Sequence, residues 1–154
     1  MKLSISQKTL DVWKEELLNA KHKEIGGVLF GEHVGDEEFR LIKFTTQRRR
    51  GGEASFKRKG REASRSLKRL SKAHGNDHSR FNYLGEWHSH PNAPAIPSTV
   101  DCRTMQSLLD DKTTIANFLV LMILRVNGQQ ELEVSASTFL ASGHILECEI
   151  EIAD

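Results

Sequence analysis

Apolar residues near the start of the chain recur at helical spacing. Leu10, Trp13 and Leu17 lie three or four residues apart, and Leu18 adjoins the last of them. Ser6 precedes this stripe and has the short polar side chain that caps a helix N-terminus. The pattern therefore predicts a helix that begins after Ser6 and ends near the basic residues 21–23, which suit the negative end of the helix dipole.

Most of the remaining apolar residues fall in short runs, which predict strands. The predicted strands cover residues 24–30, 38–46, 81–88, 117–126, 131–136 and 144–152. The adjacent glycines Gly26 and Gly27 in the first of these strands mark a place where another backbone segment can approach closely.

Two further helices are predicted between the strands. Ala63, Leu67 and Leu70 form one face of a basic helix that ends near Gly75. Another helix starts near Ser98, and its apolar face consists of Val100, Met105, Leu108 and Leu109.

The length and composition are those of one ordinary globular domain. With 154 residues, 38% of them hydrophobic and 28% charged, the chain can bury a sizeable core, so we expect a single domain over residues 1–154. Residues 1–8 lack the apolar stretch of a secretion signal, and the longest apolar run, residues 118–124, is too short to span a bilayer. Cys102 and Cys148 are too few for a disulfide framework. We therefore expect a cytoplasmic protein without a membrane partner.

The formal net charge of +1 conceals a basic segment inside an acidic chain. Residues 47–80 contain 12 Lys and Arg against 3 Asp and Glu, whereas the remainder contains 10 against 18. The glycines and like charges of residues 47–60 predict a loop or mobile insertion. Its cations, which either lie on a solvated face or bind an acidic substrate surface, are Arg48, Arg49, Arg50, Lys57, Arg58 and Lys59. Nucleic acid is not the expected partner, because Phe56 is the single aromatic residue here that could stack on bases.

Two histidines separated by one residue carry the clearest chemical signal. On a strand, His88 and His90 point to the same side, and a connection stiffened by prolines leads from them to Ser98 and Asp101. Two imidazoles, a carboxylate and a water have the composition of a catalytic zinc site. Taken alone, the histidines also fit an edge strand, and Ser98 with Asp101 also fits a helix capping box. Capping and metal binding are compatible, so the sequence predicts both.

The order and spacing of these residues resemble the motif of the JAMM (MPN+) zinc metalloproteases. The segment from His88 to Asp101 matches it, and Glu24 resembles the upstream glutamate that this family requires. The resemblance implies a fold of the α/β class. In this JAMM/MPN-like (cytidine-deaminase-like) fold, helices flank a mixed sheet. It also implies that His88, His90 and Asp101 bind Zn²⁺, that Glu24 acts as base and then acid, and that Ser98 donates a hydrogen bond to the oxyanion.

Glu86 is the rival to Glu24. Strand alternation places Glu86 on the same face as His88 and His90, so spacing alone would make it the third ligand or the base. Alternatively, Glu86 is a hydrogen-bond partner that orients one of the histidine side chains. The resemblance to the family favours Glu24 for catalysis.

The small size of the chain, its Gly85-Glu86-Trp87-His88 segment and its basic loop resemble the bacterial branch of the family. Members of this branch occur in antiphage operons, notably those of CBASS systems. The resemblance implies an isopeptidase that releases a conjugated CD-NTase by cleaving after its C-terminus. Two alternatives remain open: a deconjugase for a bacterial ubiquitin-like protein outside CBASS, and a non-catalytic MPN binding scaffold.

Overall fold

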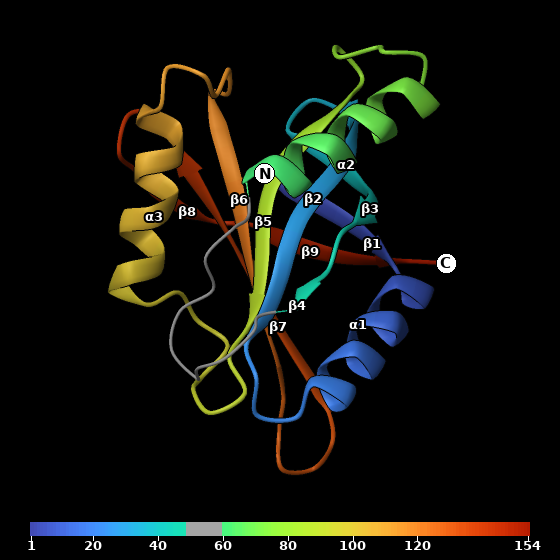
Figure 1. The fold of residues 1–154 in the computed structure, drawn as a ribbon, viewed down its shortest axis with the longest axis vertical. Helices are drawn as coiled ribbons and strands as arrows, with labels where there is room; N and C mark the ends of the chain where they lie inside the picture. Colours follow the sequence, from blue (N-terminus) through green and yellow to red (C-terminus); the bar gives the residue numbers. More distant parts are fainter. Residues whose placement is uncertain (49–59) are drawn as a thin grey trace.

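A mixed sheet organises the chain in the computed structural model, which describes residues 1–48 and 60–154 (Figure 1). Its strands are β1 (Lys2–Ser6), β2 (Ile25–Gly35), β3 (Glu38–Phe44), β4 (Gln47–Arg48), β5 (Phe81–Ser89), β6 (Phe118–Val126), β7 (Leu132–Leu140), β8 (Ile145–Glu147) and β9 (Glu149–Ala153). The helices are α1 (Gln7–Ala20), α2 (Gly60–Ala73) and α3 (Thr99–Asp110). The predicted α/β class, a mixed sheet flanked by helices, is confirmed.

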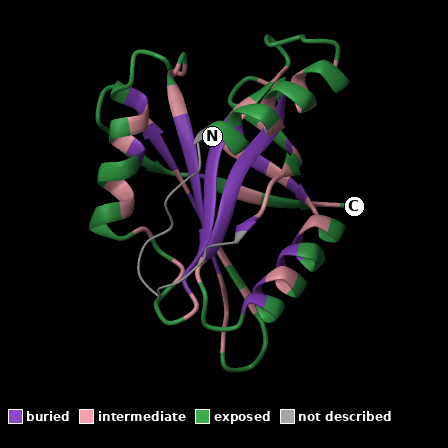
Figure 2. Cartoon of the chain, viewed as in Figure 1, coloured by how far each residue is buried: buried purple, intermediate pink, exposed green. Residues whose placement is uncertain are grey.

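The strand order is β8-β7-β6-β5-β2-β3-β1-β9, and β4 pairs with the start of β2. β5 and β6 are parallel, as is β1 to both β3 and β9, whereas the other neighbours are antiparallel. Parallel neighbours need a crossover connection, and α3 lies in the one between β5 and β6. The central strands β2, β5 and β6 carry much of the buried surface (Figure 2).

The helices cover opposite faces of the sheet. On one face, Trp13 of α1 is fully buried against the rings of Phe44 and Trp87. On the other face, Met105 and Leu109 of α3 pack on β6 and β7. α2 packs on β2 and β5. No helix in the described part of the chain is both long enough and apolar enough to cross a membrane.

Helical geometry explains which residues of the predicted apolar stripes are buried and which are exposed. The Thr9 amide donates to the Ser6 hydroxyl at 3.2 Å, so α1 begins after Ser6 as predicted. Leu18, however, is 46% exposed, because a residue adjacent to buried Leu17 is rotated by about 100° around the helix. Val100 is 60% exposed for the same kind of reason, since it lies off the face of α3 that carries Met105.

The end of the chain differs most from the prediction. Instead of one strand over residues 144–152, β8 and β9 flank Cys148 and lie at opposite ends of the strand order. The Cys148 amide donates to the Ala136 carbonyl of β7 at 3.0 Å, and the next amide, of Glu149, donates to the Met1 carbonyl at 3.1 Å. The two edge strands of the sheet therefore adjoin at Cys148, which is buried. This junction between β8 and β9 is termed the seam.

Candidate metal centre

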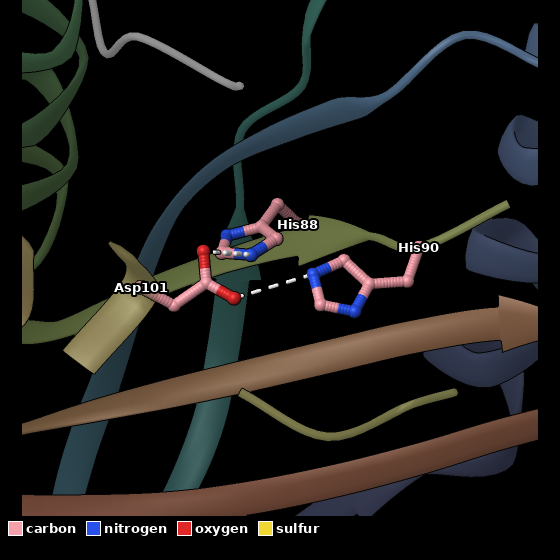
Figure 3. A group of neighbouring side chains, drawn as sticks. All are labelled: His88, His90 and Asp101. Atoms are coloured by element: carbon pink, nitrogen blue, oxygen red, sulfur yellow. Dashed lines mark ion pairs between the residues drawn. The ribbon is translucent and has the colours of Figure 1, made fainter. Parts of the chain in front are cut away.

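Two elements bring three potential metal ligands together (Figure 3). His88 lies on β5, His90 follows the end of that strand, and Asp101 lies in the first turn of α3. The Asp101 carboxylate points between the imidazoles, with Oδ1 3.1 Å from His88 Nε2 and Oδ2 3.3 Å from His90 Nε2. One donor atom from each residue lies within 4.8 Å of the other two, so the three can hold one metal ion.

The alternation of β5 directs both imidazoles to the same face. Their neighbours Trp87 and Ser89 point to the other side, where Trp87 joins the core under α1. His90 Nδ1 lies 2.9 Å from the Pro94 carbonyl, which can accept a hydrogen bond but not donate one. Nδ1 must therefore carry a proton, and in the neutral ring the lone pair of Nε2 then faces the other two residues.

Asp101 both caps the N-terminus of α3 and contacts the two histidines of the cluster. Its amide donates to Ser98 Oγ at 3.1 Å, while its Oδ2 accepts from the Ser98 amide at 2.7 Å. This is the predicted capping box, and it fixes the carboxylate in the first turn of α3. Burial opposes ionisation of Asp101, but the hydrogen bonds with His88 and His90 outweigh it and keep its pKa far below that of an ordinary carboxyl group.

Glu24 is half-buried and lies one residue before β2, two residues ahead of Gly26, which pairs with His88. The hydrogen bond with Asp101 raises the pKa of His90, burial opposes this rise, and the charge of Glu24 adds to it. The carboxylate of Glu24 is thus within electrostatic reach of His90.

Two contacts between β2 and β5 hold the backbone next to Glu24. The Ile25 amide donates to the buried Ser89 Oγ at 3.0 Å. Gly26 pairs with His88, and a Cβ at Gly26 would lie only 2.8 Å from the His88 Cβ. The predicted close approach at this glycine is confirmed, and only a residue without a side chain permits it.

Removing the Ser89 hydroxyl is expected to destabilise this junction. Ser89→Ala leaves the buried Ile25 amide without its acceptor, so the free energy of unfolding should fall by about 1–3 kcal/mol in urea titrations. Ser135→Ala is the matched control, because the buried Ser135 Oγ has no hydrogen-bond partner among the described residues. Equal effects of the two substitutions would contradict the assigned role of Ser89.

Glu86 is not one of the three clustered residues. It is 5% exposed and accepts a hydrogen bond from the Tyr83 hydroxyl at 3.4 Å. The structure places Asp101, not Glu86, between the two imidazoles.

The basic segment is described only in part. Residues 49–59, which include Arg49, Arg50 and residues 57–59 of the predicted loop, lie outside the described residues. At the start of that loop, Gln47 and Arg48 form the short strand β4, which the sequence did not predict. The predicted basic helix is confirmed as α2.

Comparisons with known proteins agree with this geometry. The model of a family described as prokaryotic homologs of the JAB domain matches residues 6–138. A protein of Enterobacter hormaechei subsp. hoffmannii named CD-NTase/cGAS isopeptidase is 30% identical over 136 residues, which cover 86% of this chain and 72% of that protein.

Two solution structures share the fold. One, of a protein from Desulfitobacterium hafniense, has a TM-score of 0.74 and 21% identity, and the match covers 99% of this chain and 93% of that one. The other, from Salinibacter ruber, has a TM-score of 0.57 and 19% identity over 100% and 92% of the two chains. With the family match over most of its length, the chain belongs to the prokaryotic JAB-domain family.

Proposed function

We propose that this protein is a zinc-dependent isopeptidase that cleaves after the C-terminus of a conjugated protein, with a conjugated CD-NTase as its substrate. The observation that carries the proposal is the convergence of His88, His90 and Asp101 in a JAB-domain chain. The relative named CD-NTase/cGAS isopeptidase supports this substrate class. The free cysteines accord with a reducing compartment, so we place the reaction in the cytoplasm of a bacterium, as part of CBASS antiviral defence.

The donor atoms of the cluster suit zinc. Two imidazole nitrogens and one carboxylate oxygen are borderline donors that zinc accepts, and three protein ligands leave a coordination position for water or substrate. Zn²⁺ bound there supplies a positive charge that acidifies water and polarises a carbonyl group.

Glu24 and Ser98 supply the remaining chemistry. Glu24, beside the cluster, takes a proton from the attacking water and returns it to the leaving amine nitrogen. Ser98 Oγ accepts the Asp101 amide hydrogen, which leaves its own hydroxyl proton for donation to the developing oxyanion. The exposure of Ser98 lets a substrate carbonyl approach it.

The two alternatives differ in substrate and in catalysis. A deconjugase for another ubiquitin-like protein would use the same residues, so only substrate preference separates it from our proposal. A non-catalytic scaffold has no need for Glu24, Ser98 and three clustered ligands together, and their combination favours an enzyme.

A fusion substrate tests the function directly. A CD-NTase joined through its C-terminus to a reporter should be cleaved at the junction, and a zinc chelator should stop the reaction until zinc is restored. The measurement is the release of the reporter on a gel and by mass spectrometry.

Parallel fusions separate the alternatives. Cleavage of a ubiquitin-like fusion but not of the CD-NTase fusion would keep the enzyme and overturn the substrate. Cleavage of neither fusion after zinc loading would favour the scaffold.

A further inference from the structure

We propose that the exposed cationic side of α2 is a docking site for an acidic surface on the folded body of the substrate. This side, termed the α2 ridge, consists of Arg61, Arg65, Lys68, Arg69 and Lys72. The inference rests on the proposed function, because it assumes that a folded protein is presented for cleavage.

The packing of α2 leaves the ridge free. Ala63 is buried, and Leu67 and Leu70 are half-buried, at spacings of four and three residues that place them on one side of the helix. The five cations occupy other positions, and all are exposed. They span 11 residues of rise, or about 16 Å, which is enough to contact a protein surface at several points.

The charge pattern of α2 is unfavourable for the helix itself. Arg61 and Arg65, Arg65 and Arg69, and Lys68 and Lys72 are like charges four residues apart, a spacing that destabilises a helix. Arg61 also lies in the first turn, where the helix dipole repels cations, whereas Glu62 in that turn and Lys72 in the last turn suit the dipole. Within the described ranges, no carboxylate forms an ion pair with any of the five. A local rule that is broken, with no ion pair from the described residues to offset it, indicates a functional surface.

The ridge lies on the sheet face that carries the candidate metal centre. Phe30 of β2 pairs with Tyr83 of β5, and Tyr83 packs in the cluster under α3. The ring of Phe30 also contacts His74, directly after α2. α2 and α3 therefore pack on the same face, whereas α1 packs on the opposite one. The residue after α2, His74, contacts Phe81 at the start of β5, whereas the cluster lies at the end of that strand. A protein whose tail reaches the cluster can contact α2 if its folded body extends along this face.

The charges favour an acidic protein over nucleic acid. Outside residues 47–80 the chain has an excess of acidic residues, 18 against 10 basic ones, which repels a long polyanion. α2 itself contains no aromatic residue for base stacking. A limited acidic patch on a protein can face the ridge without meeting the acidic remainder of the chain.

The test compares a folded with an unfolded substrate. The triple variant R61E/R65E/R69E and its matched control K8E/K14E/K21E, on and beside α1 on the other face, are assayed on two substrates. One is the CD-NTase fusion, and the other is a short peptide of the same C-terminal tail linked to a fluorophore. The α2 variant should lose about tenfold or more in kcat/KM on the fusion, mainly through a higher KM, and should keep wild-type kinetics on the peptide. The control should match wild type on both substrates.

Each other outcome overturns the docking site. Equal losses on fusion and peptide would mean that α2 acts through the fold, and R61Q/R65Q/R69Q, with circular dichroism, separates that case from misfolding. No loss on either substrate, or a loss confined to oligonucleotide binding, would reject an acidic protein partner. If wild type cleaves neither substrate, the proposed function fails, and calorimetric titration of the CD-NTase against wild type and the α2 variant still decides the docking site.

Discussion

Glu24→Ala should abolish cleavage of the fusion substrate while the metal stays bound. The charge of Glu24 acts on His90, but Glu24 is not among the three clustered residues, so its removal leaves every proposed ligand in place. Loss of a general base that also serves as the acid lowers kcat by about 10²- to 10⁴-fold. Single-turnover kinetics and metal analysis of the same sample measure the two effects together.

Glu86 provides the control for this prediction. Glu86→Gln changes a buried carboxylate on β5, on the same face as His88, yet should retain most of the activity because Glu86 is neither a proposed ligand nor the proposed base. Glu24→Gln keeps the size of the side chain and should be as inactive as Glu24→Ala. Loss of metal in either Glu24 variant, or equal inactivation by Glu86→Gln, would overturn the assignment of the base.

Asp101→Ala should abolish both metal binding and activity. The substitution removes one of three donors, so the loss of affinity should exceed the roughly 10- to 100-fold that follows when only a residue behind a ligand is changed. It also removes the acceptor of the Ser98 amide, so α3 should lose about 0.5–2 kcal/mol of capping energy. Zinc titration with a competing chelator and thermal unfolding of the metal-free protein report these two losses separately.

Ser98→Ala separates capping from metal binding. It removes the acceptor of the Asp101 amide and should weaken α3 by a similar amount, but it should keep the metal and lower kcat by about 10²- to 10³-fold through loss of an oxyanion donor. Full metal retention by Asp101→Ala would contradict the proposed ligand set.

Patterns among residues close in the sequence predicted the candidate site better than they predicted the arrangement of the sheet. The capping box and the alternation of His88 and His90 depend on residues close in the sequence, and the structure has both features. The position of Glu24, two residues before the Gly26 that pairs with His88, depends on the register between β2 and β5, which spacing cannot reveal. Resemblance to the family supplied it, whereas spacing alone pointed to Glu86.

The missed strands have physical causes. β1 is short, and only Leu3 and Ile5 alternate within it, a signal too weak to separate from a chain terminus. The division between β8 and β9 arises because β7 and β1 each offer a free edge on either side of Cys148. No pattern within residues 144–152 encodes the distant partners.

The seam at Cys148 bears on how the protein folds after synthesis. β1 leaves the ribosome before the rest of the sheet, yet one of its two neighbours in the sheet is β9, with Lys2 paired to Glu149. Contacts so distant in sequence carry a high loop-closure entropy and slow folding. Until β9 emerges, β1 exposes an unpaired edge that can associate with other nascent chains. Recombinant yield should therefore depend on the rate of translation and on chaperones more strongly than the size of the domain suggests.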